Sequence, residues 1–372
     1  MERAPHVKNL RKSRILVAPL DWGLGHATRC IPIIRELENR GAEVWLAGEG
    51  AVESLLKTEF PGLRFVHLDG YRARYGGTAA GLTWQMLLQS GRFLNRIKAE
   101  HSWLRKIVKE KSIDGVISDN RYGLYHESIP TVFITHQLQI KSPLGKWSER
   151  IIQQKNYRYI NHFNECWIPD EEGKENLGGE LSHPKKNPVI PLKYIGSLSR
   201  FKASQATVQK GHLLVLLSGP EPPRTLLENI LTREIAHYAG TATVVRGLPG
   251  HDKLIPSTNR IRFYNHLPAD QLHHEIMNAE FVIARSGYST LMDMARMRKK
   301  CILIPTPGQP EQEYLAAYWQ QKQFAIGLPQ KNFNLQKALE QARSFSYKEP
   351  VLPPNNRLGE IIDHFLHSLS SR

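Results

Sequence analysis

The chain has 372 residues but only three cysteines, fewer acidic than basic residues and no long apolar run. Cys30, Cys166 and Cys301 are widely spaced, so they form neither a metal-ligand pattern nor an even disulfide set. We therefore expect a reducing, cytoplasmic compartment. A membrane-spanning helix is not expected, because no stretch of about 18 apolar residues occurs. The polar, basic segment Met1–Arg14 lacks the apolar core of a secretory signal.

The second shortage is of negative charge: 35 Asp and Glu residues face 50 Lys and Arg residues, a net charge of +15. Such a balance favours an anionic partner, which could be nucleic acid, an anionic membrane surface or a phosphorylated substrate. Composition alone does not choose among the three. No helix-turn-helix, zinc or RNA-binding motif is present, so the nucleic-acid alternative rests on charge alone.

Short apolar runs rich in β-branched residues alternate with helical patterns. In the first half they are Arg14–Leu20, Ala42–Ala47, Leu63–Leu68, Gly115–Ser118, Thr131–Thr135 and Cys166–Ile168. In the second half they are His212–Leu217, Ala242–Arg246, Ile261–Tyr264, Phe281–Ala284 and Cys301–Pro305. The runs are nearly continuous in apolar character and do not alternate with polar residues, which indicates strands covered on both faces, as in parallel sheets. With helical patterns between them, such as Leu226–His237, they predict doubly wound α/β architecture.

The series of strands is interrupted between about Glu171 and Gln209, where glycine, proline and charged residues gather. We interpret this region as the linker, with Tyr194–Arg200 crossing between two Rossmann-like domains. The expected units are an N-terminal domain at 1–198, a C-terminal domain at 199–352 and a final helix in 353–372 that packs back across the domains. In open α/β sheets, ligands bind beyond the carboxyl ends of the strands, so the residues after each strand are the candidates for function.

The first predicted strand is followed by Asp21-Trp22-Gly23-Leu24-Gly25-His26 and then by a helix. The glycines permit a tight turn and close approach of a ligand, although the third glycine of the dinucleotide fingerprint is missing. A histidine at the helix entry can accept a proton from a hydroxyl near neutral pH, which makes His26 a candidate base. A capping or core role for His26 explains the same pattern equally well.

The strand Phe281–Ala284 is followed by Arg285-Ser286-Gly287-Tyr288-Ser289-Thr290 and by a helix containing Asp293. Free N–H groups and the positive dipole end at such a helix start form an anion site. Asp293 would repel a phosphate but could accept hydrogen bonds from ribose hydroxyls. The alternative is an ordinary helix start capped by Ser286 or Ser289.

Two further turns offer polar groups. The strand Cys301–Pro305 ends in a proline, and a stiff loop with two further prolines then delivers Gln312 and Glu313 to a helix start. Amide and carboxylate groups suit sugar hydroxyls, although Glu is also favoured at any helix start. The first strand of the second half ends in Ser218-Gly219, a small-residue turn that could touch a diphosphate.

Together these segments resemble the MurG-like glycosyltransferases, the group that contains the peptidoglycan N-acetylglucosaminyl transferase. The similarity is greatest from Ala284 to Tyr318, where Arg285-Ser286-Gly287 with Thr290 and Asp293 resembles that family's Arg-Ser-Gly…Thr…Glu signature. Pro305 to Tyr314 resembles the loop ending in Gln-Gln-Tyr, and Gly23-Leu24-Gly25-His26 the N-terminal glycine loop. His136 and Gln137 resemble a second conserved loop on the acceptor side, where we also place Asp119.

The resemblance implies a GT-B fold with two Rossmann-like domains facing a cleft. It implies that Asp293 binds the ribose of a UDP-sugar and that Gln312 and Glu313 bind the donor sugar. The resemblance implies that Ser218, Ser286 and Gly287 lie near the diphosphate and that the backbone near Leu267 faces the base. The other residues expected to bind the nucleotide sugar are Gly25, Gly219, Arg285 and Thr290. The sequence departs from the pattern at Asp293, which is Glu in the family, at Glu313, which is Gln, and in the loop after His136.

The implied activity is an inverting, metal-independent transfer of a hexose or N-acetylhexosamine from a UDP-sugar, with His26 as base. The UDP-sugar is a substrate, and no cofactor or metal is expected, which agrees with the absence of an Asp-x-Asp motif from the sequence. A nucleotide-sugar hydrolase is the nearest alternative, because some share a Gly-x-Gly-His-x-x-Arg-Cys run like that from Gly23 to Cys30. A sugar-nucleotide-binding protein without catalysis is another. The sequence leaves the acceptor open.

One helical stretch combines basic and apolar residues. Its members are Arg92, Arg96, Lys98, Arg105, Lys106, Lys109 and Lys111, among Phe93, Leu94, Ile97, Trp103, Leu104, Ile107 and Val108. Such a helix can lie on an anionic membrane, which would place the protein at the inner face of the plasma membrane and favour a lipid-linked acceptor. The alternative, a solvated helix packed on its sheet, is slightly favoured.

Overall fold

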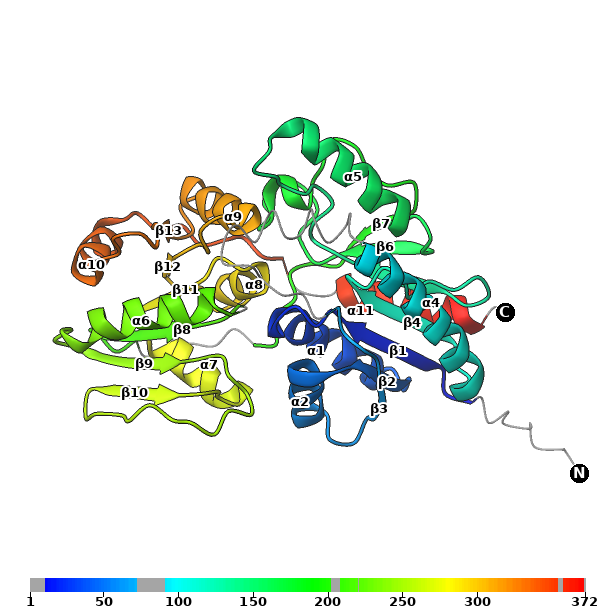
Figure 1. The fold of residues 1–372 in the computed structure, drawn as a ribbon, viewed down its shortest axis with the longest axis horizontal. Helices are drawn as coiled ribbons and strands as arrows, with labels where there is room; N and C mark the ends of the chain where they lie inside the picture. The colour runs from blue at the N-terminus through cyan, green and yellow to red at the C-terminus, as the bar shows by residue number, and fades with distance from the viewer. Residues whose placement is uncertain (1–10, 72–90, 202–207, 220, 354–356, 371–372) are drawn as a thin grey trace, which may run out of the picture.

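The fold consists of two parallel sheets, one in each half of the chain, as the runs of apolar residues predict. The computed structural model describes residues 11–71, 91–201, 208–219, 221–353 and 357–370. Within this described part, the first sheet has seven strands in the order β3-β2-β1-β4-β5-β6-β7 and the second has six, in the order β10-β9-β8-β11-β12-β13. Figure 1 shows the two halves side by side, with helices on both faces of each sheet. The predicted doubly wound α/β class is confirmed.

The first half carries its strands in a continuous parallel register. They are β1 (Arg14–Pro19), β2 (Glu43–Gly48), β3 (Arg64–His67), β4 (Gly115–Asp119), β5 (Thr131–Ile134), β6 (Glu165–Ile168) and β7 (Leu192–Tyr194). The helices are α1 (Leu24–Asn39), α2 (Gly50–Glu59), α4 (Gly91–Lys111) and α5 (Lys146–Ile160), with a short 3-10 turn η1 (Gly179–Leu181). Strand β7 lies inside the region interpreted as linker. The sequence does not predict this strand, because its three residues are too few to stand out among the prolines and charges around them.

The second half repeats the architecture. Its strands are β8 (His212–Leu216), β9 (Thr241–Val245), β10 (Ile261–Tyr264), β11 (Phe281–Ala284), β12 (Cys301–Leu303) and β13 (Ile326–Gly327). Its helices are α6 (Pro223–Ala236), α7 (Ala269–Asn278), α8 (Tyr288–Arg296), α9 (Pro310–Gln321) and α10 (Leu335–Ser344). The two-residue strand β13 was not predicted, because it is too short to form an apolar run.

The last helix, α11 (Arg357–Ser370), returns to the first half. Phe365 packs edge-on against Trp167 of β6, with 5.7 Å between the ring centroids, and Asp363 forms an ion pair with Arg40 after α1. Pro354, one of the two prolines that mark the start of this segment, lies outside the described residues. The chain thus crosses between the halves twice, once after β7 and once before α11.

The basic helix α4 packs its apolar side on the first sheet. Leu104 and Ile107 belong to a buried cluster with residues of β1, β2 and β4, and Phe93 and Ile97 are buried as well. Lys98, Arg105, Lys106 and Lys109 are exposed, whereas the side chain of Arg92 lies outside the described part. This arrangement is that of a solvated helix packed on its sheet. No helix in the described residues is long and apolar enough to cross a membrane.

Candidate active site

A cavity of about 420 Å³ lies between the two halves, at the carboxyl ends of their strands. It is lined by residues that the sequence singled out in both halves. From the first half these are Gly25, His26, His136 and Gln137, and from the second Ser218, Gly219, Gly287, Thr290, Asp293 and Gln312. Asp119, Leu267, Arg285, Ser286 and Glu313 are not among the lining residues, although a chain neighbour of each except Arg285 is. The structure therefore gathers most of the predicted site around one cleft.

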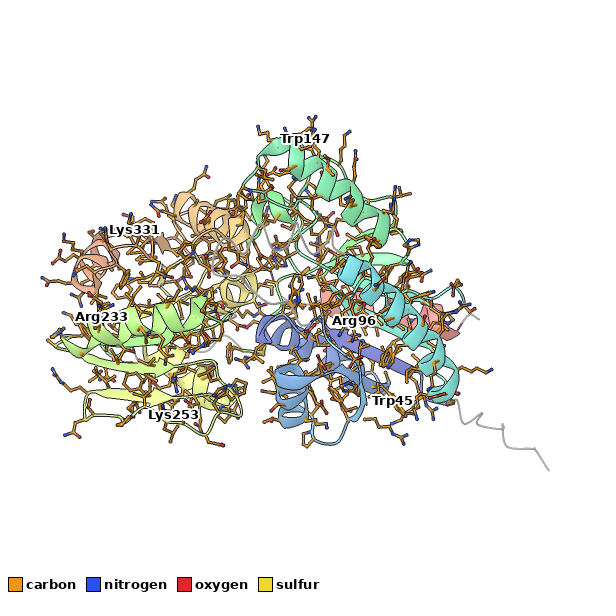
Figure 2. All side chains as sticks on the ribbon, viewed as in Figure 1. Trp45, Arg96, Trp147, Arg233, Lys253 and Lys331 are labelled. Atoms are coloured by element: carbon orange, nitrogen blue, oxygen red, sulfur yellow. The ribbon has the colours of Figure 1, made fainter. Side chains whose placement is uncertain are left out.

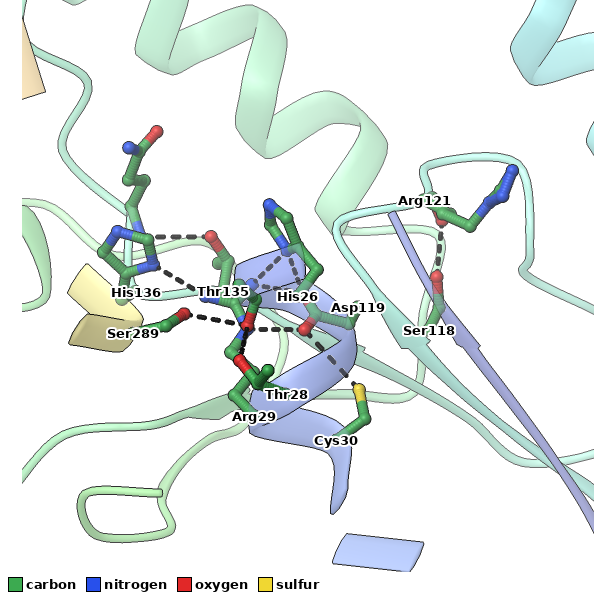
Figure 3. A network of polar contacts seen from close by, with 12 residues as sticks. His26, Thr28, Arg29, Cys30, Ser118, Asp119, Arg121, Thr135, His136 and Ser289 are labelled. Carbon is green, nitrogen blue, oxygen red and sulfur yellow. Dashed lines mark hydrogen bonds and ion pairs between the residues drawn. The ribbon is translucent and has the colours of Figure 1, made fainter. Parts of the chain in front are cut away.

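His26 lies in the first turn of α1, and its ring contacts a buried carboxylate. Its Nδ1 is 2.9 Å from Oδ1 of Asp119, the last residue of β4. Asp119 is fully buried and also forms an ion pair with Arg29, one turn further along α1 (Figure 3). Burial alone would raise the pKa of Asp119, but Arg29 and His26 outweigh it and hold that pKa well below its usual value. Asp119 is thus an ionised group behind His26 rather than an exposed contact for the acceptor.

Nδ1 of His26 has two partners of opposite kind. The ionised carboxylate of Asp119 can only accept a hydrogen bond from it, whereas Nη2 of Arg29, 2.8 Å away, can only donate one. In the tautomer that pairs with Asp119, Nδ1 carries the hydrogen and the lone pair is on Nε2, to which none of the described residues donates. His26 lines the cavity, so this arrangement suits a base that takes a proton from a group bound there.

The amino end of α8 opens into the same cavity without a side-chain cap. Gly287 is the N-cap residue, and no side chain accepts a hydrogen bond from the first N–H groups of the helix. The two serines that could have capped it are bonded elsewhere: Ser286 donates to the carbonyl of Gln312 and Ser289 to the carbonyl of Gly25. The alternative of a serine-capped helix is therefore wrong, and the free N–H groups are of the kind that can bind an anion.

The close contact between α8 and the Gly25 loop explains why glycine occupies position 25. A Cβ atom there would lie 3.0 Å from Oγ of Ser289, so a larger residue would require the Ser289 side chain to shift. Helix α1 also begins without a side-chain cap, at Gly23 with a φ of 82° that favours glycine. Two uncapped helix starts, one from each half, therefore line one cavity.

Asp293 faces the cavity from α8, beside the segment that crosses between the halves. Its Oδ1 accepts a hydrogen bond of 2.6 Å from the hydroxyl of Ser199. Burial raises the pKa of Asp293 to about 6, although the neighbouring Arg200 and Ser199 act in the opposite direction. Arg200 and His266 also line the cavity here. A carboxylate in this position can accept hydrogen bonds from the hydroxyls of a ligand.

Arg285 and Leu267 serve the fold rather than the cavity wall. The buried guanidinium of Arg285 donates to the carbonyls of Ile304, Pro305 and Pro223 at distances of 2.8–3.1 Å. Burial lowers its pKa to about 10. Leu267 is buried in the core, and its neighbour His266 lines the cavity instead. Arg285 therefore ties the loops after β11 and β12 to the start of α6.

In the loop after β12, the carboxylate that lines the cavity is not the predicted one. The side-chain oxygen of Gln312 accepts a hydrogen bond from the Thr306 amide, and Gln312 still lines the cavity. Glu313 instead accepts a hydrogen bond from the Gly308 amide, outside the cavity lining. Glu311, which the sequence analysis passed over, lines the cavity, and its Oε1 is 2.8 Å from Nε2 of His136.

Arg29 and Glu311 are the functional candidates that sequence reasoning missed. Arg29 follows His26 by three residues, a spacing that places both side chains on one face of a helix. Glu311 could have been identified from its position in the sequence. It follows Pro310 at the start of α9 and lies nearer the end of the preceding strand than Glu313 does. Both signals depend on knowing where the helices begin.

The described residues also include one group of side chains with metal-ligand spacing, Glu49, His67 and Asp69. All three lie outside the lining of the cavity. Asp69 also forms an ion pair with Arg96 of α4.

Comparisons with known proteins agree with this geometry. Residues 260–355 match the model of the glycosyltransferase family 28 C-terminal domain. An uncharacterized glycosyltransferase of Methanosarcina mazei is 24% identical over 325 residues, 82% of each chain, and one of Methanosarcina acetivorans is 23% identical over 324 residues. The chain is a glycosyltransferase of the GT-B fold. The comparisons leave its donor and its acceptor open.

Solved structures similar to this glycosyltransferase share its fold across both halves. The glycosyltransferase SnogD from Streptomyces nogalater superposes with a TM-score of 0.59 at 13% identity, covering 95% of this chain and all of SnogD. MurG of Acinetobacter baumannii superposes with a TM-score of 0.51 at 11% identity, covering 97% of this chain and 99% of MurG. At these identities the likeness concerns the fold alone.

Proposed function

We propose that the enzyme transfers a hexose or N-acetylhexosamine from a UDP-sugar to an acceptor hydroxyl, with inversion and without a metal. The observation that carries the proposal is that the uncapped amino end of α8 lines the same cavity as His26. An anion site and a base facing one cavity are what a diphosphate leaving group and an attacking hydroxyl require.

In the proposed reaction the acceptor oxygen attacks the anomeric carbon as its proton passes to Nε2 of His26. The bond between that carbon and the diphosphate oxygen breaks on the opposite face, and the electron pair leaves with UDP. Asp119 stabilises the charged imidazole through Nδ1. The N–H groups at the start of α8 stabilise the negative charge that grows on the diphosphate. In this proposal they do what a metal ion would otherwise do.

The donor would lie along the second half of the cavity. Ser218, Gly219 and Gly287 are small residues that let the diphosphate approach the backbone, and Asp293 would accept hydrogen bonds from the ribose. Gln312 and Glu311 would contact the sugar. Glu311 replaces Glu313 in this proposal, because the carboxylate of Glu313 is occupied outside the cavity lining.

The acceptor would enter from the first half, where Gln137, Ile140, Lys141 and Leu181 line the cavity. The apolar side chains among them favour an acceptor with a hydrophobic part. The turn before α5 continues from this wall and exposes Leu144 and Trp147 beside Lys146 and Arg150. Exposed apolar side chains among cations suit an anionic bilayer, so we place the peripheral membrane contact here rather than on α4.

The experiment that tests the proposed function is a thermal-shift and turnover screen with UDP, other nucleoside diphosphates and their sugars. A tight ligand raises the apparent melting temperature by mass action, so UDP should give the largest shift. UDP release should then require an added acceptor. Full-rate release of UDP with water alone would indicate a hydrolase instead, and no shift with any nucleotide would refute the proposal.

A further inference from the structure

His136 belongs to the first half but is held by the second. It follows β5, is buried, and its ring stacks on that of Tyr288 with 4.2 Å between centroids and 3° between planes. Its Nε2 is 2.8 Å from Oε1 of Glu311, and its Nδ1 is 3.1 Å from Nη1 of Arg29 (Figure 3 shows the contact with Arg29). Both ring nitrogens are therefore engaged, one on each side of the cleft.

The partners of His136 determine its tautomer. Arginine can only donate, so Nδ1 accepts from Arg29 and carries no hydrogen. The hydrogen is then on Nε2, which donates it to the carboxylate of Glu311. His136 is neutral in this arrangement, and burial, which lowers its pKa against the effect of Glu311, favours the same state.

These contacts form a chain across the cleft. Glu311 is joined to His136, His136 to Arg29, Arg29 to Asp119 and Asp119 to His26. This series of contacts starts at Glu311, in the loop of the second half that would face the sugar, and ends at His26, the proposed catalytic base in the first half. Close to it, Ser289 of α8 donates to the Gly25 carbonyl at 2.8 Å, one of several other direct hydrogen bonds between the halves.

We propose that His136 is a positioning residue that holds the Glu311 carboxylate against the sugar of the bound donor. This inference rests on the proposed function. Among the described residues, His136 is the sole hydrogen-bond partner of Glu311, and it engages Oε1 alone. Oε2 is left to accept from a sugar hydroxyl, and the side chain of Glu311 is 23% exposed at the cavity. The contact with the sugar therefore forms correctly only when the halves are closed on each other.

The charge of Glu311 is also set by this arrangement. Burial would raise its pKa, but the hydrogen bond from His136 and the charge of Arg29 outweigh that effect and lower it. An ionised carboxylate accepts stronger hydrogen bonds than a neutral amide does. Replacing Glu311 by Gln should therefore weaken the hold on the sugar while keeping its size and shape.

The test compares the affinity of the full-length protein for UDP with its affinity for UDP-glucose and for UDP-N-acetylglucosamine, measured by calorimetry. The variants are His136→Gln, Glu311→Gln and the double variant, with Glu313→Gln as matched control from the same loop. His136→Phe is a second variant that keeps the stack on Tyr288 and removes the hydrogen bonds, in case His136→Gln does not fold.

We expect wild type to bind one UDP-sugar more tightly than UDP. Each single variant at 136 or 311 should reduce that advantage by about ten-fold, with UDP affinity unchanged within about two-fold. Because both act on one contact, the double variant should lose no more than Glu311→Gln alone. Glu313→Gln should behave as wild type.

Three results would overturn the inference. The first is that His136→Gln or His136→Phe still binds UDP-sugar more tightly than UDP by the wild-type factor. The second is that the affinity losses of the two single variants multiply in the double variant, and the third is that wild type binds no UDP-sugar more tightly than UDP. A change in UDP affinity equal to that for UDP-sugar would indicate a general packing role instead and also refute it. Failure of wild type to bind UDP at all refutes the proposed function first, which keeps the two failures distinguishable.

Discussion

Oδ1 of Asp119, at the end of β4, lies 2.9 Å from Nδ1 of His26, in the first turn of α1. Asp119 is fully buried, so its charge is compensated only by groups that touch it, and Arg29 is the permanent cation among them. Asp119 therefore orients the imidazole and stabilises the tautomer with hydrogen on Nδ1, against Nη2 of Arg29, which lies 2.8 Å from the same nitrogen.

Asp119→Asn should abolish most of the transfer activity. The amide of Asn can donate to Nδ1, which would move the hydrogen to Nε2 and remove the base. We expect turnover to fall by at least about 100-fold, as when an orienting carboxylate is lost from a catalytic histidine. UDP release in the presence of acceptor is the measurement.

His26→Ala is the companion to that variant, because it removes the base and leaves the buried ion pair of Arg29 and Asp119 in place. Turnover should again fall by at least about 100-fold, while UDP affinity by calorimetry stays within about two-fold. Unchanged turnover in His26→Ala would remove this histidine from catalysis, whatever Asp119→Asn does.

The sequence predicts the fold better than the contacts of single side chains. Apolar runs locate most of the strands, because burial on both faces leaves a local signal. The direction of a side chain is not local: Arg285 and Glu313 carry the polar groups of a binding loop, yet one bonds three carbonyls and the other a loop amide. The pairing of His136 with Glu311 joins residues 175 positions apart, so neither segment alone indicates it.

Asp293→Ala should weaken UDP binding. The carboxylate faces the cavity from α8 and is held there by Ser199, in the position expected for ribose hydroxyls. Loss of a hydrogen bond to a charged group corresponds to about 1.5–3 kcal/mol, or about a 10- to 150-fold rise in Kd. Calorimetry with UDP measures it, and intact affinity would remove Asp293 from the ribose site.

The ionisation of Asp293 should also affect stability. Its pKa in the folded protein is about 6, above the value of about 3.9 in an unfolded chain. Between these values the folded state binds the proton more tightly, so the free energy of unfolding falls as pH rises from about 4 to above 6. Asn cannot ionise, so Asp293→Asn removes this dependence on pH. The free energy of unfolding of the variant, relative to wild type, should therefore be about 1–2 kcal/mol higher at high pH than at low pH, a figure reduced for partial solvent screening.

Urea unfolding of wild type and Asp293→Asn below about pH 4.5 and above about pH 7 measures this difference. Wild-type stability must be compared without nucleotide, since bound UDP would stabilise the folded state by itself. A difference between the two proteins that does not change with pH would show that Asp293 titrates normally.

Arg285→Met should lower stability more than UDP affinity. The guanidinium is buried and satisfies three carbonyls, and methionine would fill much of its volume while leaving those oxygens without a donor. We expect a loss of about 2–4 kcal/mol in the free energy of unfolding, with UDP affinity changed by less than about three-fold. Unchanged stability with lost UDP affinity would place the guanidinium on the nucleotide instead.

The membrane contact proposed for the start of α5 is tested by vesicle flotation. Trp147 is 75% exposed and stands at the outer end of α5 in Figure 2, and Leu144 is 65% exposed beside it. Lys146, Arg150, Lys155 and Arg158 are exposed on this helix, and two acids lie near its start. Glu149 accepts hydrogen bonds from Ser142 and Gln139, and Glu180 forms an ion pair with Lys141. The wild-type protein should therefore float with phosphatidylglycerol vesicles and not with phosphatidylcholine vesicles.

A double variant, Leu144→Ser and Trp147→Ser, should lose at least about ten-fold in vesicle affinity, because burying two such side chains contributes a few kcal/mol. Leu254→Ser is the matched control: Leu254 is 67% exposed, but it lies in the second half, away from this turn. Raising the salt concentration should weaken the wild-type interaction, since cations on the surface attract the lipid head groups. If flotation persists in the double variant and is lost in Lys98→Glu with Lys106→Glu, the contact lies on α4 and not on α5.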